Sequence, residues 1–207
     1  MKLAILGASG HGKVTADAAE ACGFREIVFF DDAWPSISTN GPWPVIGTTR
    51  DLLLNHASYS GVVVAIGNNA IRHHKLNALL DAGAPVVSVV HPSATVSRHS
   101  SLGVGSVVFA GAVVNAGALV GAGAIVNTNS VVEHDCVLGI SCHVSPGAVL
   151  AGGVRLGDCV WIGSNASVRQ LVSIDNNSVV GMGAVVTRHL TANITVVGNP
   201  ARSIKNS

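Results

Sequence analysis

A chain of 207 residues is long enough to bury a substantial core, in either one domain or two small ones. Its 12 Lys and Arg residues nearly balance its 11 Asp and Glu residues, which argues against a nucleic-acid-binding surface or a polybasic membrane patch. Only 11% of the residues are charged, 48% are hydrophobic and 24 are glycine, so small and aliphatic side chains must fill the core.

The most apolar stretch, residues 107–126, has the length of a transmembrane helix. Its four glycines weaken a helix, and its pattern continues through more polar sequence on both sides, so we expect no membrane segment. The first residues lead into a glycine-rich segment without a signal-peptide cleavage region, and the four cysteines form no CxxC pair or disulfide framework. These features predict a cytoplasmic protein with reduced thiols.

Strands and helices alternate over the first ninety residues, as in a small parallel, Rossmann-like α/β sheet. A Trp- and Pro-containing loop separates the second strand from the second helix. We predict strands over 2–6, 27–30, 62–66 and 85–90, and helices over 13–22, 49–56 and 70–81.

A glycine-rich turn with GxxGxG spacing follows the first strand, at Gly7, Gly10 and Gly12. It lacks the complete GxGxxG fingerprint, so full NAD binding is the less favoured interpretation. The turn nevertheless presents backbone N–H groups and a positive helix end, with Lys13 as a counter-charge and His11 between the glycines. Gly10, His11, Gly12 and Lys13 are therefore candidate ligands of a diphosphate.

Two further candidate segments follow strands at the same edge of the sheet. Asp31 and Asp32 come after the second strand, where a carboxylate can accept hydrogen bonds from ribose hydroxyls or a base N–H. A turn or a helix cap is the alternative. Gly67 and Asn68 come after the third strand, where they either end it or contact a ligand.

From position 96 onward, an aliphatic residue recurs every six positions, and a compact residue stands two positions before each one. A period of six fits neither a 3.6-residue helix nor simple strand alternation, but it suits a solenoid of short strands joined by tight corners. Cys136 and Cys142 occupy compact positions, and the cysteines and histidines lack a familiar ligand spacing, so we expect core residues and no metal. The aliphatic positions are Val96, Leu102, Val108, Val114, Val120, Val126, Val132, Leu138, Val144, Leu150, Leu156, Ile162, Val168, Ile174, Val180 and Val186.

His134 and Asp135 interrupt the small, apolar texture of this repeat, and His143 follows nine residues later. A neutral imidazole can take a proton from an attacking amine, which suits a base titrating near neutrality. The alternatives are a surface histidine on a corner for His134 and a hydrogen-bonded buried histidine for His143.

Residues 91–202 resemble the hexapeptide-repeat acyltransferases, whose left-handed parallel β-helix has three hexads per coil. The stretch 127–147 is similar to the active-site segment of the sialic-acid O-acetyltransferase-like, or PglD-like, subfamily, as is the overall layout. The resemblance implies a nucleotide-sugar-binding α/β domain at 1–90 and a β-helix acetyltransferase domain at 91–207. In an 18-residue coil His134 and His143 lie half a turn apart, so we expect active sites at subunit interfaces, and the resemblance implies that the assembly is a homotrimer.

By position, the resemblance implies that His134 is the general base and that Asp135, where many relatives have Glu, orients it. It places His143 near the acetyl group, and Gly152, one coil above His134, leaves room for a thioester. The terminal segment 196–202 resembles the motif that lies near coenzyme A in the family. Glycines of the repeat can equally be corner residues. The implied cofactor contacts are His143, Gly152, Gly163, Ser164, Gly181, Gly183 and Arg202.

The leading hypothesis is transfer of an acetyl group from acetyl-CoA to the 4-amino group of a UDP-linked 4-amino-4,6-dideoxy sugar. The sugar amine attacks directly, without an acetyl-enzyme. GDP- and dTDP-linked amino sugars are close alternatives, and O-acetylation of a sugar such as sialic acid is another. A non-catalytic nucleotide-sugar-binding protein is a more distant possibility.

Overall fold

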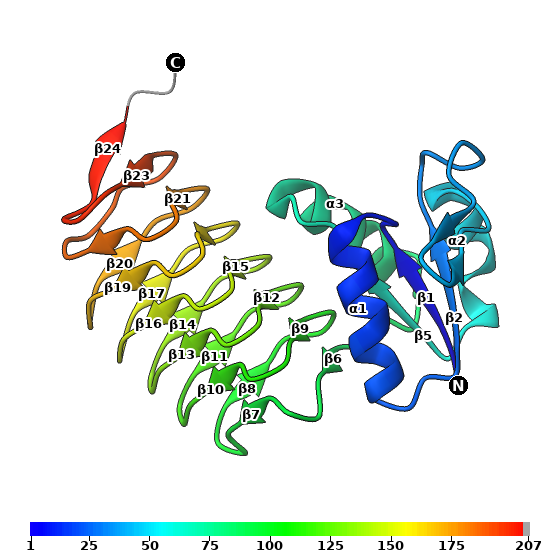
Figure 1. Ribbon diagram of the computed structural model, residues 1–207, viewed down its shortest axis with the longest axis horizontal. Coiled ribbons are helices and arrows are strands. Elements are labelled where there is room, and N and C mark those ends of the chain that lie inside the picture. Colours follow the sequence, from blue (N-terminus) through cyan, green and yellow to red (C-terminus); the bar gives the residue numbers. More distant parts are fainter. Residues whose placement is uncertain (205–207) are drawn as a thin grey trace. The chain divides into compact units, whose positions relative to one another are not determined.

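The computed structural model describes residues 1–204, in which the chain divides into two compact units that meet between Pro92 and Ser93 (Figure 1). Unit 1 is an α/β unit with a parallel sheet, and unit 2 is a β-helix, so the predicted fold class is confirmed. No helix within residues 1–204 is long and apolar enough to cross a bilayer. The apolar stretch 107–126 forms short strands of the β-helix instead.

Unit 1 is built on a parallel sheet with the strand order β2-β1-β5, and a short antiparallel pair, β3 and β4, lies between β2 and α2 in the chain. Each of its three α-helices contacts strands of this sheet. The elements are β1 (Lys2–Leu6), α1 (Gly10–Ala21), β2 (Glu26–Phe30), β3 (Thr39–Asn40), β4 (Trp43–Pro44), α2 (Thr49–Asn55), the 3-10 helix η1 (His56–Ser58), β5 (Gly61–Val64), α3 (Asn69–Asp81) and β6 (Val89–Val90).

Two elements of unit 1 differ from the sequence prediction. Helix α1 starts at Gly10, three residues early, because Gly12 allows close packing: a Cβ there would collide with the Gly7 carbonyl oxygen. The strand expected at 85–90 is reduced to a single bridge between Val62 and Val86, followed by the short β6. Pro85 has no N–H to donate, which limits pairing at the start of that segment.

Unit 2 winds through three faces of short parallel strands (Figure 1). The first face contains β7 (Thr95–Val96), β10 (Val113–Val114), β13 (Val131–Val132), β16 (Val149–Leu150), β19 (Ser167–Val168) and β22 (Val185–Val186). The second contains β8 (Ser101–Leu102), β11 (Leu119–Val120), β14 (Val137–Leu138), β17 (Arg155–Leu156) and β20 (Ser173–Ile174). The third contains β9 (Val107–Val108), β12 (Ile125–Val126), β15 (His143–Val144), β18 (Trp161–Ile162), β21 (Val179–Val180), β23 (Thr195–Val197) and the antiparallel β24 (Arg202–Ile204).

The hexad rule accounts for the interior of the β-helix. Strands pair at a spacing of 18 residues, as Val114 does with Val132, and these aliphatic side chains are fully buried. Each such burial contributes roughly 1.5–3 kcal/mol. Cys136 and Cys142 are fully buried beside them, as predicted. After Val186, where the hexads stop, pairing shifts to a spacing of 16 residues.

The corners impose a second rule, because the third residue after the aliphatic position has a positive φ at every hexad except the first and the last. Where it is not glycine, this residue is mostly Asn or Asp, the side chains that tolerate the left-handed region best. Asp135 is one of them, with a φ of 60°. The corner conformation therefore favours a short carboxylate or amide at the position beside His134.

Candidate active site

His134 lies on the corner between β13 and β14, where the first face turns into the second. Its Nδ1 is 2.8 Å from Oδ2 of Asp135, and since a carboxylate only accepts hydrogen bonds, Nδ1 carries the proton. Nε2 is then the basic nitrogen. The two side chains are 65% and 74% exposed, so a reactant can reach this nitrogen.

Glu133 is a second carboxylate at this corner that the sequence analysis missed. Its Oε2 accepts hydrogen bonds from Asn115 Nδ2, at 2.9 Å, and from the backbone N–H of His134, at 3.2 Å. The hydrogen bond from Nδ1 to Asp135 is the main cause that raises the pKa of His134, and the charges of Asp135 and Glu133 raise it further. The signal in the sequence that could have identified Glu133 is the presence of an acidic residue in a repeat that carries few charges.

Asp135→Asn should move the acidic limb of the pH–rate profile to lower pH. The base must be unprotonated, so wild-type turnover falls as the pH drops through the raised pKa of His134. Without the carboxylate this pKa falls, and the active form persists at lower pH. The plateau should also drop, because an amide N–H can select the wrong tautomer.

The measurement is kcat/KM against pH for both proteins with the same acceptor, so that the ionisation of the acceptor cancels. Asp158→Asn is the matched control, since Asp158 is a half-buried corner carboxylate that accepts the Ile140 N–H. An acidic limb that stays in place in Asp135→Asn would contradict the electrostatic link.

Gly152 lies one coil above His134 at the equivalent corner position, and its role is steric. A Cβ built on Gly152 would lie 2.5 Å from both Cε1 and Nε2 of His134. The imidazole therefore occupies the room that the missing side chain leaves. Gly152 does not need glycine for its backbone, because its φ is outside the left-handed region.

His143 lies on β15 of the third face, away from the corner that carries His134. Asn127 Oδ1 accepts the Thr128 N–H, so the Asn127 amide nitrogen faces Nε2 of His143, at 3.1 Å. Nε2 is then the acceptor, and the proton of a neutral His143 resides on Nδ1. The His143 ring stacks on Trp161, with centroids 6.0 Å apart and an interplanar angle of 7°.

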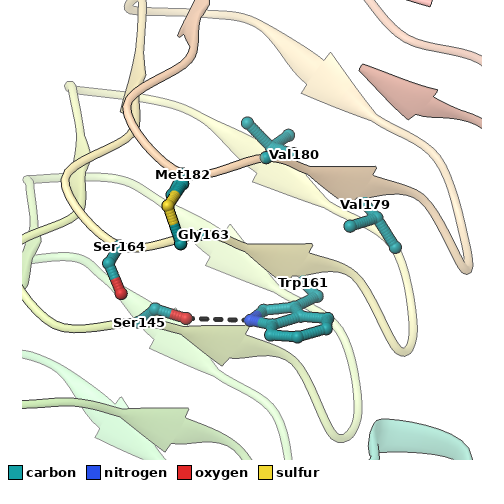
Figure 2. A pocket seen from close by; sticks show the side chains of 8 residues that line it. Ser145, Trp161, Gly163, Ser164, Val179, Val180 and Met182 are labelled. Atoms are coloured by element: carbon teal, nitrogen blue, oxygen red, sulfur yellow. Dashed lines mark hydrogen bonds between the residues drawn. The ribbon is translucent and has the colours of Figure 1, made fainter. Parts of the chain in front are cut away.

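Trp161 also lines a mainly apolar pocket of about 160 Å³ (Figure 2). Two of the lining residues are hydrogen-bonded to each other: the Trp161 indole N–H donates to Ser145 Oγ at 2.8 Å, as the dashed line in Figure 2 shows. The sequence analysis missed Trp161, although an aromatic directly before core Ile162 must face outward. The pocket is lined by Ser145, Trp161, Gly163, Ser164, Val179, Val180, Gly181 and Met182.

The expected cofactor residues thus separate into three groups. Gly163, Ser164 and Gly181 line the pocket beside Trp161. Gly183 is a corner residue with a φ of 65°. Arg202 lies exposed on β24, where its Nη1 donates to the Ala201 carbonyl.

In unit 1, the glycine turn and the start of α1 lie at the carboxyl end of β1. In the described structure the N-cap residue of α1, Ser9, makes no side-chain capping hydrogen bond, so its hydroxyl does not cap the positive end of the helix. Gly10, His11 and Gly12 belong to that first turn, and the Lys13 side chain is exposed.

The other candidates of unit 1 have local structural roles. Asp31 accepts the backbone N–H groups of Ala8 and Ala33, which ties β2 to the glycine turn. Asp32 accepts the Thr49 N–H and pairs with Lys75 at 2.7 Å, and this hydrogen bond lowers the Asp32 pKa. The turn and cap interpretation therefore describes both aspartates in this structure.

Gly67 and Asn68 connect β5 to α3. Asn68 is the N-cap of α3, and its Oδ1 accepts the Ile71 N–H at 3.0 Å. Gly67 has open space where a Cβ would lie. Across residues 1–204, no group of three or more His, Cys, Asp and Glu side chains is arranged to hold a metal ion.

Comparison with known proteins places this arrangement in a family. Residues 2–79 match the family described as the PglD N-terminal domain. Over 215 aligned residues the chain is 32% identical to the GDP-perosamine N-acetyltransferase of Escherichia coli O157:H7, covering 98% of this chain and 96% of that relative. The chain belongs to the PglD-like hexapeptide-repeat N-acetyltransferases. The resemblance recognised in the sequence is confirmed.

Solved structures of PglD-like enzymes agree over the whole length. The acetyltransferase domain of PglB from Neisseria gonorrhoeae FA1090 is 43% identical with a TM-score of 0.92, covering 98% of this chain and 99% of that chain. PerB from Caulobacter crescentus, in complex with CoA and GDP-perosamine, is 36% identical with a TM-score of 0.94, covering 99% and 98%. This PglD-like protein is an acetyl-CoA-dependent N-acetyltransferase, and acetyl-CoA is its co-substrate, as predicted.

Proposed function

We propose that this chain acetylates the 4-amino group of a nucleotide-linked 4-amino-4,6-dideoxy sugar, with His134 as the general base. The observation that carries the proposal is the His134–Asp135 pair, whose geometry makes Nε2 the basic nitrogen of the neutral ring on an exposed side chain. The sugar amine attacks the thioester carbonyl, a C–N bond forms and the C–S bond breaks. Nε2 takes the amine proton, and coenzyme A leaves as its thiol after gaining a proton.

The uncapped start of α1 supports unit 1 as the holder of the nucleotide. N–H groups of the first turn and the positive helix end stabilise a diphosphate, and Lys13 adds a charge nearby. UDP is the expectation from the sequence. The full-length relative named for GDP-perosamine and a Bacillus subtilis relative named for UDP-N-acetylbacillosamine, 33% identical over 52% of this chain, give both nucleotides a place in the test.

The proposal is tested by thiol release from acetyl-CoA with a panel of UDP-, GDP- and dTDP-linked 4-amino sugars and free sialic acid. We expect turnover of one nucleotide amino sugar. Turnover of sialic acid alone would move the assignment to O-acetylation. Binding of a nucleotide amino sugar without any thiol release would favour the non-catalytic alternative.

A homotrimer with shared active sites is part of this proposal. His134 occupies the corner between the first two faces, whereas His143 lies on the third, so one β-helix cannot bring both to the same reactant. Large apolar side chains are also exposed on unit 2: Leu119 at 51%, Leu171 at 72% and Met182 at 81%. Packing against neighbouring copies would cover such side chains.

Co-expression of His134→Ala and His143→Ala subunits should recover activity that each variant alone lacks. If every site takes His134 from one subunit and His143 from its neighbour, each mixed trimer contains one intact site of its three, so about one third of the wild-type rate returns. The rate is measured per trimer after purification through two different tags. Mixed trimers no more active than either parent would place both histidines in one subunit's site.

A further inference from the structure

Arg72, on α3, is 1% exposed, and the sequence analysis did not single it out. Its Nη1 donates to the carbonyl oxygens of Ile66, at 2.8 Å, and Gly67, at 3.1 Å, and its Nη2 donates to Asn69 Oδ1 at 2.8 Å. All three acceptors belong to the segment 66–69, which connects β5 to α3 at the carboxyl end of β5. A rigid guanidinium fork therefore holds this segment from the inside.

A buried guanidinium is costly to desolvate, so the fold needs a reason to place one here. Starting α3 is not that reason, because the Asn68 side chain already caps the helix. An apolar side chain of similar volume would fill the same space. Only the guanidinium supplies both a positive charge and hydrogen bonds to two consecutive carbonyl groups.

Arg72 also acts on His11, in the first turn of α1. Burial is the main cause that lowers the His11 pKa to about 4, and the charge of Arg72 lowers it further. His11 is therefore neutral at pH 7 and offers one donor and one acceptor nitrogen. The charge that reaches His11 also reaches the N–H groups of the same turn, where an anion would bind.

We propose that Arg72 is a positioning residue of the nucleotide site: it holds the segment 66–69 against the glycine turn, where Gly7 closely approaches Ile66, and adds a buried positive charge behind the diphosphate. The ligand chemistry is that of a nucleoside diphosphate, and the inference rests on the proposed function. Arg72 does not touch the ligand, because its side chain is enclosed and its donors are engaged with the segment 66–69.

The test compares binding of GDP and of UDP, by calorimetry, to wild type, Arg72→Met and Arg72→Lys. Arg72→Met should weaken binding of the preferred nucleotide by about tenfold or more, because both the positive charge and the hydrogen bonds of the guanidinium are lost. Arg72→Lys keeps the positive charge but loses the planar guanidinium, and it should weaken binding of the same nucleotide by about threefold. Arg25→Met is the matched control, since Arg25 is exposed just before β2, at the opposite edge of the sheet.

A second readout separates the charge from a purely structural role. By NMR, the His11 pKa should rise in Arg72→Met and stay low in Arg72→Lys, while the affinity for acetyl-CoA stays unchanged in both. Thermal melting and fluorescence of the buried Trp43 report whether unit 1 remains folded. If Arg72→Met does not fold, Arg72→Lys decides, and wild-type affinity in that variant overturns the proposal.

The outcomes also distinguish this proposal from the function on which it rests. Wild type that binds neither GDP nor UDP overturns the nucleotide site and, with it, the role of Arg72. Wild type that binds a nucleotide which a folded Arg72→Met binds equally well overturns only the role of Arg72.

Discussion

Replacing His134 with alanine should lower kcat by about 1000-fold while the affinity for acetyl-CoA stays near that of wild type. Among the described residues, His134 is the only group at this corner whose geometry leaves a basic nitrogen free. The substitution removes that nitrogen, and the loss of activity follows. The His134 side chain is 65% exposed, so its truncation leaves the coil intact and should leave Tm almost unchanged. The measurement is thiol release at saturating acetyl-CoA, with analytical ultracentrifugation to confirm the assembly.

His189→Ala is the comparison for His134→Ala, because His189 stands at the end of the β-helix, where its Nδ1 accepts the Ser173 N–H. A general loss caused by removing any histidine from the β-helix would lower both activities alike. If His134→Ala kept wild-type kcat over the whole pH range, the assignment of the base would be wrong.

Replacing Gly152 with alanine should have the second-largest effect, a loss of about 100-fold in kcat. The added Cβ would lie 2.5 Å from Cε1 and Nε2 of His134, too close for the imidazole to remain where it is. The ring must turn away, and an error of about 1 Å in the position of a catalytic group costs roughly 100-fold. Because the φ of Gly152 is accessible to alanine, the coil should accommodate the methyl group and Tm should change little.

Ala116→Ser is the matched control for Gly152→Ala, because Ala116 stands one coil before His134 at the equivalent corner position. It adds one heavy atom on the other side of the imidazole and should leave kcat within about twofold of wild type. A crystal structure of Gly152→Ala with the imidazole undisplaced would refute the steric argument, as would normal kcat in that variant.

The β-helix could be predicted from the sequence because its contacts repeat. An aliphatic side chain at every sixth position packs against the equivalent aliphatic side chain of the next coil, so one local rule generates the whole core. The same regularity made His134 and Asp135 conspicuous, since a charged pair in an apolar repeat calls for a separate reason. Cys136 and Cys142 followed as core residues from their place in the hexad.

Unit 1 was less predictable, because no repeat constrains it. The order of strands and helices followed from hydrophobic runs and glycines, but the start of α1 depended on the close approach of Gly12 to the Gly7 carbonyl. The contacts of Asp31 and Asp32 also required the path of the loops, since their partners Ala8 and Thr49 come from other segments of the chain.

The sequence by itself therefore determined the two-part architecture, the hexad core and the position of the candidate base. The tertiary structure alone decided that the His134 ring lies over Gly152, that Asn127 and Trp161 orient His143, and that Arg72 is buried where it binds the segment 66–69. The physical reason is that periodic burial needs only residue type at a fixed spacing. The direction of a single polar side chain depends instead on its rotamer and on neighbours that the folded chain brings from other coils or loops.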